Sequence, residues 1–204
     1  TAFANPYPMM EGKTKKKIKY KRADGIDLTA TVYLPAGYDK EKDGRLPVLM
    51  WAYPREYRNA KDAAQVRGSQ YNFSIIKYGS PIFWVTRGYC VMENVEMPIV
   101  GSEDKEPNDT YIEQLVMDAE AAVKVITDMG VGDPERIGVG GHSYGAFMTG
   151  NLLTHTKLFK AGIARSGAYN RTLTPFGFQS ETRTYWEAPE VYNAMSPFMY
   201  ANQL

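Results

Sequence analysis

Residues 136–145 of the chain read Arg-Ile-Gly-Val-Gly-Gly-His-Ser-Tyr-Gly. The apolar residues 137–139 predict a short buried strand, and the small and apolar residues 146–153 predict a helix. Between them, residues 141–145 fit the pattern G-x-S-x-G. A strand, a tight turn with this pattern and a helix form the context of a nucleophile elbow, which exposes a serine hydroxyl above a sheet. We therefore predict that Ser143 is a nucleophile.

The turn itself explains why glycines flank the serine. A sharp turn forces Ser143 into a strained backbone conformation, and side chains at Gly141 and Gly145 would collide with the neighbouring strand and helix. The backbone N–H of Tyr144, at the start of the helix, is then available to stabilise an oxyanion. The alternative is a glycine-rich turn without a catalytic role, because G-x-S-x-G also occurs by chance.

Composition limits the classes of function. The chain has 204 residues, the size of one domain, and 44% of them are hydrophobic. Its formal net charge of +1 gives no support for a nucleic-acid partner. No apolar run approaches the ~20 residues of a membrane helix, so we expect no membrane association. No metal-ligand cluster or phosphate-binding loop is evident, so we expect no metal and no cofactor. The single cysteine, Cys90, lies in an apolar run and is expected in the core.

The order of the apolar runs predicts an α/β fold with a mostly parallel sheet and helices on both faces. Two β-rich runs flank Asp24-Gly25, which is a hairpin signal. Buried strands at 46–53 and 88–95 follow, then a helix with a capping box from Thr110 to Glu113. The elbow and a last strand at 161–164 complete the pattern. An N-terminal hairpin and a central elbow predict an α/β-hydrolase fold, truncated before its last strands.

The catalytic machinery is incomplete in this sequence. A serine nucleophile needs a base, usually histidine, and an orienting carboxylate, and in this fold both follow the serine in the chain. His142 and His155 are the two histidines, and we interpret both as structural. Either the chain stops before the triad is complete or it is a non-catalytic relative; we favour the first. We therefore expect the chain alone to be inactive, with an exposed sheet edge that pairs with a second copy or with the missing portion.

The elbow resembles that of the prolyl oligopeptidase family of serine peptidases. Residues 141–146, Gly-His-Ser-Tyr-Gly-Ala, include the tyrosine that follows the serine in that family, and Asp-Pro-x-Arg-Ile-Gly at 133–138 is also typical of it. Residues 47–53 match its opening strands. Two stretches, 52–57 and 165–178, are similar to the glutamyl endopeptidase branch. The resemblance spans nearly the whole chain.

This resemblance implies roles for further residues. In the family, a tyrosine at the position of Tyr53 supplies the second oxyanion donor beside the Tyr144 N–H. The segment after the last predicted strand lines the primary substrate pocket. A substrate glutamate would need an arginine there, because the planar guanidinium binds a carboxylate with two hydrogen bonds. Arg171, close to the aromatic Tyr169, is our first candidate for substrate binding, and Arg165 is the second.

The resemblance also implies a longer parent protein. Family members carry an N-terminal β-propeller and complete the hydrolase domain with the aspartate and histidine that are absent here. We therefore expect residues 1–12 to be a linker from a missing propeller and residues 13–204 to be the N-terminal portion of the peptidase domain. For the compartment, we favour a bacterial periplasmic or secreted parent.

Together, these observations predict a catalytic-domain fragment of a serine peptidase whose parent cleaves peptide substrates after glutamate. Two alternatives remain open. One is a non-catalytic α/β-hydrolase-like interaction module, and the other is an esterase that acts on small acyl substrates. An aspartate and a histidine downstream in the parent gene would favour an enzyme, and an upstream propeller would argue against a free-standing esterase.

Overall fold

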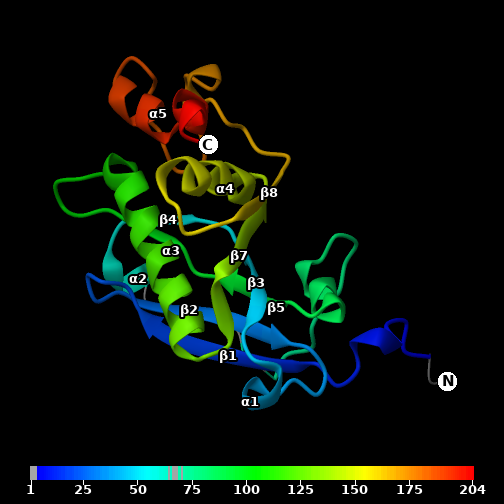
Figure 1. The fold of residues 1–204 in the computed structure, drawn as a ribbon. Coiled ribbons are helices and arrows are strands. Elements are labelled where there is room, and N and C mark those ends of the chain that lie inside the picture. The colour runs from blue at the N-terminus through cyan, green and yellow to red at the C-terminus, as the bar shows by residue number, and fades with distance from the viewer. Residues whose placement is uncertain (1–3, 64, 66–68, 70) are drawn as a thin grey trace.

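A computed structural model describes residues 4–63, 65, 69 and 71–204 (Figure 1). Its main sheet has six strands in the order β1-β2-β5-β3-β7-β8, and β4 and β6 form a separate pair. The strands are β1 (Thr14–Lys21), β2 (Asp27–Leu34), β3 (Leu46–Ala52), β4 (Arg55–Tyr57), β5 (Cys90–Val95), β6 (Pro98–Val100), β7 (Gly132–His142) and β8 (Ala161–Arg165).

The helices connect these strands and continue after β8. The α-helices are α1 (Lys40–Asp43), α2 (Ala60–Ala63), α3 (Tyr111–Asp128), α4 (Tyr144–His155) and α5 (Pro189–Met195). Short 3₁₀ helices are η1 (Pro8–Met10), η2 (Pro81–Arg87), η3 (Pro107–Thr110), η4 (Arg171–Leu173) and η5 (Pro197–Gln203). In Figure 1 the segments after β8, coloured orange and red, gather around α4 at one end of the molecule.

The strand pairing confirms the predicted α/β sheet. β1 and β2 form the antiparallel hairpin, and β2 joins β5 in antiparallel orientation. β3 then lies between β5 and β7, parallel to both, and β8 is parallel to β7. The elbow at the end of β7 is therefore beside the end of β3. Because neighbouring parallel strands have their carboxyl ends at the same edge of the sheet, the loops that follow these strands meet there.

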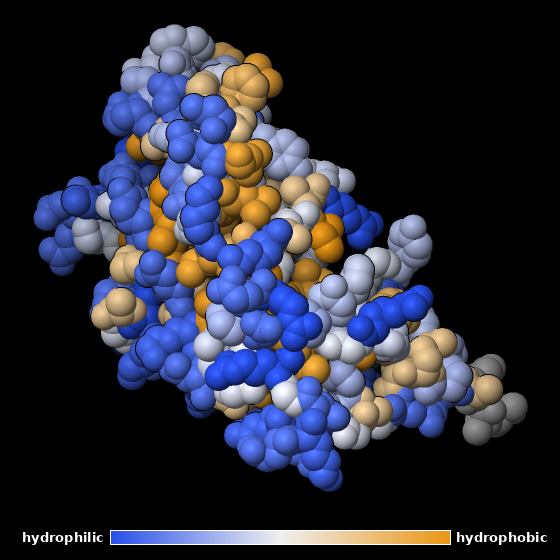
Figure 2. Space-filling view, viewed as in Figure 1, coloured by the Kyte–Doolittle hydropathy of each residue, from blue (hydrophilic) through white to orange (hydrophobic). Residues whose placement is uncertain are grey.

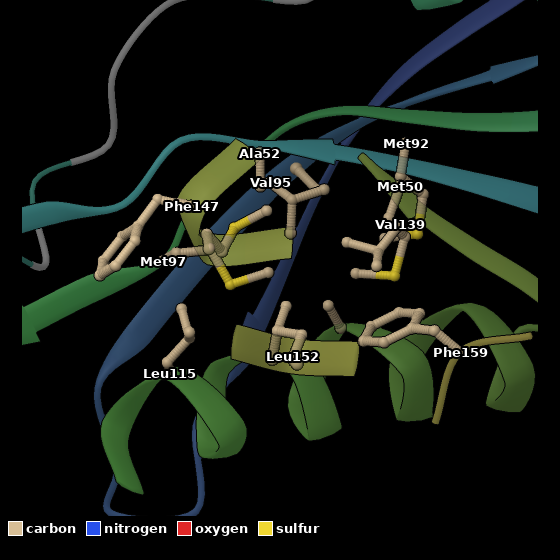
Figure 3. Close-up of a cluster of buried hydrophobic side chains, with 14 of the residues drawn as sticks. Met50, Ala52, Met92, Val95, Met97, Leu115, Val139, Phe147, Leu152 and Phe159 are labelled. Carbon is tan, nitrogen blue, oxygen red and sulfur yellow. The ribbon is translucent and has the colours of Figure 1, made fainter. Parts of the chain in front are cut away.

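Successive side chains of a strand point to opposite faces of the sheet, and a hydrophobic cluster lies on each face. Cys90 and Met92 of β5 belong to the larger cluster, which includes residues of α3 and α4. Val91, between them, faces the smaller cluster with residues of η1 and η2. Figure 3 shows Met50, Met92 and Val139 directed toward the helical layer. Cys90 is 0% exposed, which confirms its predicted place in the core, and this burial raises the pKa of its thiol to about 12.

The start of α3 differs from the prediction. Thr110 makes no capping hydrogen bond with its side chain; the capping box lies one turn earlier, between Glu106 and Asp109. The chain enters α3 through η3, and the Thr110 hydroxyl accepts a hydrogen bond from the Gln114 amide instead. The predicted capping box from Thr110 to Glu113 was therefore wrong, because the preceding 3₁₀ turn already satisfies the first backbone donors.

The expected linker has some structure of its own. Within its described part, residues 4–12, η1 places Met10 in the smaller hydrophobic cluster, where it is 3% exposed. The lead-in is thus packed against the domain at this point rather than fully extended. Its role as a linker from another domain stays a prediction.

The far edge of the sheet is open among the described residues. All five residues of β8 are exposed. A groove of about 380 Å³, lined in part by Leu49, Trp84 and Ile163, lies next to this edge. Figure 2 shows hydrophobic residues at the surface near α4 and the segments after β8, whereas hydrophilic residues cover the region around β1 and α1. The predicted exposed edge is therefore present.

A buried ion cluster ties the hairpin to the helical layer. Arg22, which follows β1 and is 3% exposed, donates to Asp118 Oδ1 of α3 at 3.0 Å and to both oxygens of Asp24. It also donates to Gln114 and to the Pro98 carbonyl. Burial raises the pKa of Asp118 well above its ordinary value, and the Arg22 charge opposes that rise. The buried carboxylate depends on Arg22 for its charge compensation.

Replacing Arg22 with methionine should therefore lower the free energy of unfolding of the chain by about 3 kcal/mol or more, because Asp118 would be buried without its cation. The loss should shrink as the pH falls toward about 4, since a protonated Asp118 carries no charge. Urea unfolding followed by circular dichroism measures both effects. The control is Lys21→Met, which removes the exposed Lys21–Asp27 pair and should cost less than about 1 kcal/mol. Equal losses in the two variants would contradict the role of the buried cluster.

Candidate active site

The turn between β7 and α4 holds Ser143 in a strained conformation. Its backbone angles are φ 57° and ψ −115°, a region that residues other than glycine rarely occupy. The Ser143 N–H donates to the carbonyl of Arg165 in β8 at 2.9 Å. Its own carbonyl accepts hydrogen bonds from the N–H groups of Ala146 and Phe147. The strained residue is thus held from the sheet on one side and from α4 on the other.

Close backbone contacts explain the two flanking glycines. A Cβ atom at Gly141 would lie 2.5 Å from the backbone carbon of Gly145. A Cβ atom at Gly145 would lie 2.4 Å from the carbonyl oxygen of Ala52 and 3.8 Å from the Cα atom of Tyr53. The distances of 2.5 Å and 2.4 Å are to backbone atoms, so neither Gly141 nor Gly145 can be replaced by a larger residue without a backbone shift, as predicted from the sequence. They also place the start of α4 directly against the end of β3.

This packing brings Tyr53 to the elbow. Tyr53 is the first residue after β3, and its side chain is 44% exposed. Its ring contacts that of Tyr144 edge to face, with 5.8 Å between the ring centroids. Tyr144 is the first residue of α4, so its backbone N–H has no acceptor inside the helix. The two predicted oxyanion donors therefore come from neighbouring segments.

The Tyr144 side chain makes a contact that the sequence analysis missed. The ring is 1% exposed and stacks on Phe147 with 5.2 Å between centroids. Its hydroxyl donates to Oε1 of Glu56 in β4 at 2.6 Å. Burial raises the pKa of the Glu56 carboxyl, and the hydrogen bond from Tyr144 opposes that rise. The only sequence signal for this contact was the position of Glu56 in the stretch 52–57, three residues after Tyr53.

Arg171 is buried among aromatic rings. It is 5% exposed, and the central carbon of its guanidinium lies 4.0 Å from the ring centroid of Phe147 and 4.5 Å from that of Phe178. The Tyr144 ring is 5.4 Å away. Within the described residues, the buried Arg171 Nε has no hydrogen-bond partner. Aromatic faces stabilise a cation but offer no acceptor for its hydrogens, so this group can still bind an anion.

The two other predicted binding residues lie in different surroundings. Arg165 is exposed on β8, and a Cβ atom at Gly79 would be 2.4 Å from its Nη1, so its guanidinium packs against that turn. Tyr169 is 37% exposed, and its hydroxyl donates to the Ala164 carbonyl at 3.1 Å. Arg171 is therefore the arginine that the structure brings together with Tyr144.

Both histidines make contacts that fit structural roles. His142 ends β7, and its Nδ1 lies 3.2 Å from the Arg165 carbonyl oxygen. His155 ends α4, roughly 16 Å along the helix from its start. Its Nδ1 lies 2.9 Å from the carbonyl oxygen of Asn151, and its ring packs on Tyr200.

The described part of the chain contains no group of three or more histidine, cysteine, aspartate or glutamate residues that could hold a metal ion. In the same residues, no helix is both long enough and apolar enough to span a membrane.

Comparisons with known proteins show which proteins this chain is similar to. Residues 108–204, which contain the elbow, match the prolyl oligopeptidase family. Over 205 aligned positions, the chain is 55% identical to proteins described as probable chloroplastic glutamyl endopeptidases from Oryza sativa subsp. japonica and from Arabidopsis thaliana. The alignments cover the whole chain but 22% and 21% of these proteins. The chain thus spans about a fifth of the length of the curated relatives it matches.

Solved structures share the fold. Dipeptidyl peptidase 4 of Porphyromonas gingivalis superposes with a TM-score of 0.68 at 25% identity, over 95% of this chain and 26% of that one. An acylaminoacyl peptidase of Pyrococcus horikoshii superposes with a TM-score of 0.69 at 20% identity, over 97% of this chain and 31% of that one. The predicted resemblance and fold are therefore confirmed: the chain is related to glutamyl endopeptidases and belongs to the prolyl oligopeptidase family.

Proposed function

We propose that the chain is part of the catalytic domain of a longer serine peptidase, in which Ser143 attacks the peptide carbonyl. The observation that carries this proposal is the strained Ser143 at the head of α4, between two glycines that no larger residue can replace without a backbone shift. A serine needs a base to accept its proton. Because His142 and His155 are engaged elsewhere, we assign the base and its carboxylate to a part of the longer protein outside this chain.

The oxyanion side of the reaction lies within the chain. When the Ser143 oxygen adds to the carbonyl carbon, negative charge develops on the carbonyl oxygen. We assign the Tyr144 N–H and the Tyr53 hydroxyl as its two donors, since the Tyr53 ring contacts Tyr144. Hydrogen-bond donors that are already in place stabilise the charge on this oxygen, which is larger in the transition state than in the substrate. Such selective stabilisation of the transition state raises the reaction rate. The leaving amine then takes its proton from the base, and water hydrolyses the acyl-enzyme.

The test compares the longer protein with the isolated chain on one chromogenic peptide. The Ser143→Ala variant of the longer protein should lose at least ~10⁴-fold in kcat, because the nucleophile is gone. The isolated 204-residue chain should be similarly inactive, because its base is absent. If the isolated chain instead turned over the peptide at the rate of the longer protein, one of its own histidines would have to be the base.

We propose that the substrate is a peptide with a glutamate immediately before the scissile bond, and that the side chain of this glutamate binds to Arg171. The buried Nε without a partner supports this assignment, and so does the name of the two plant relatives. A carboxylate that leaves water needs a charge-assisted partner, and arginine can supply two parallel hydrogen bonds. Arg165 is the second candidate, although its guanidinium packs against the turn at Gly79. Tyr169, on the segment between β8 and η4, would line the same pocket.

The Arg171→Met variant of the longer protein tests this specificity. Methionine keeps apolar bulk between Phe147 and Phe178 but removes the charge, so the ratio of kcat/KM for a Glu peptide to that for a matched Gln peptide should fall by ~10²-fold. Arg165→Met is the matched control, and its ratio should stay within a few-fold of the parent. A preference for glutamate that survives in both variants would place the carboxylate-binding group elsewhere.

We also propose that a further part of the longer protein covers the open edge at β8. Exposed strand edges pair readily with other chains, and every residue of β8 is exposed. In the isolated chain this edge should drive dimer formation, which multi-angle light scattering can measure. A monodisperse monomer at tens of micromolar would contradict the proposal.

For the compartment, we propose a periplasmic or secreted location of the whole protein, whereas the names of the two plant relatives give a chloroplastic location for those proteins.

A further inference from the structure

Tyr144 contacts one acidic and one basic side chain. The carboxylate of Glu56 accepts the hydrogen bond from the Tyr144 hydroxyl, and the guanidinium of Arg171 lies 5.4 Å from the centroid of the same ring. Burial raises the pKa of Glu56, and the charge of Arg171 opposes that rise. Burial lowers the pKa of Arg171, and the charges around it, Glu56 among them, oppose that fall. The two groups therefore both lie near Tyr144 and interact electrostatically with each other.

The position of Glu56 is fixed by its surroundings. β4 pairs with β6, where Glu56 is opposite Ile99. The Tyr144 ring that it contacts is almost fully buried and stacked on Phe147. Glu56 is half-buried, and hydrogen bonds from the hydroxyls of Tyr144 and Ser180 restrain its carboxyl. When it is ionised, this carboxylate adds a negative charge to the surroundings of Arg171.

We propose that Glu56 is a specificity-tuning residue, whose fixed carboxylate limits the attraction of Arg171 for the glutamate side chain of a substrate. This inference rests on the proposed role of Arg171 as the group that binds that side chain. A substrate carboxylate would approach a cation whose charge is already partly compensated, and it would also be repelled by Glu56. At separations of several ångströms and an effective dielectric constant of about 20, one such charge changes binding by roughly tenfold or more.

The buried Tyr144 hydroxyl explains why an acceptor is needed at this position. A buried hydroxyl without a partner is costly, so residue 56 must present an oxygen. Glutamine would present one without a charge. The substitution Glu56→Gln therefore separates the two contributions of this side chain, because it keeps the acceptor for Tyr144 and removes the negative charge near Arg171.

The experiment measures the ratio of kcat/KM for matched Glu and Gln peptides in the longer protein. Glu56→Gln should raise this ratio about tenfold, which is opposite in sign to the effect of general damage to the site. Glu56→Ala should raise the ratio too, but it should also lower kcat for both peptides, because the Tyr144 hydroxyl loses its acceptor. Glu113→Gln, which removes an exposed negative charge on α3, is the control and should leave the ratio unchanged.

A double-mutant cycle with Arg171→Met completes the test. If Glu56→Gln raises the ratio in the parent, Arg171→Met abolishes the preference for glutamate and Glu56→Gln has no effect in the Arg171→Met background, the proposal is supported. If Arg171→Met abolishes the preference but Glu56→Gln leaves the ratio unchanged or lowers it in the parent, the proposal about Glu56 is overturned and the function of Arg171 stands. If Arg171→Met keeps the preference, the assignment of Arg171 fails and the inference about Glu56 falls with it.

Discussion

The candidate site depends on the close approach of α4 to the end of β3. The two backbones meet so tightly that a single carbon atom on Gly145 would lie 2.4 Å from the Ala52 carbonyl oxygen. This contact places the first residue of α4 beside Tyr53, the first residue after β3. In the turn that leads into α4, Ser143 adopts a positive φ, and its N–H donates to the Arg165 carbonyl of β8. Strain of this kind persists only where the surrounding structure over-determines it.

Among the residues that the structure describes, two arginines are buried, and their charges are compensated very differently. Arg22 has hydrogen bonds to Asp118, to both oxygens of Asp24 and to Gln114, so its donors are well satisfied and its role is structural. Arg171 lies against aromatic rings, and its Nε has no partner among the described residues. A buried cation with spare donors is costly in a folded protein unless a ligand completes its shell. This contrast favours a binding role for Arg171.

Membership of the prolyl oligopeptidase family supports the proposal that the residues around the elbow act together in catalysis and substrate binding. The chain holds the candidate nucleophile, both candidate oxyanion donors and the candidate carboxylate-binding arginine. These groups lie on segments that follow β3, β7 and β8, which are neighbours in the sheet. In a parallel sheet the loops at the carboxyl ends of adjacent strands lie side by side, so distant parts of the sequence come together at one site. Glu56 belongs to the same arrangement because β4 continues the loop after β3.

Local patterns were enough for the elements and for the elbow. The hairpin, the central strands, the elbow turn and its glycines follow from hydrophobic periodicity and from backbone sterics, which act over a few residues. The start of α3 was predicted wrongly, because the 3₁₀ helix η3 precedes α3 and the capping box lies there, between Glu106 and Asp109, rather than at Thr110. The contact between Glu56 and Tyr144 joins residues 88 positions apart, and the burial of Arg171 depends on rings from α4 and from the segment after η4. Such pairings arise only when the sheet order brings separate segments together, so the tertiary structure alone determined which charged side chains meet at the site.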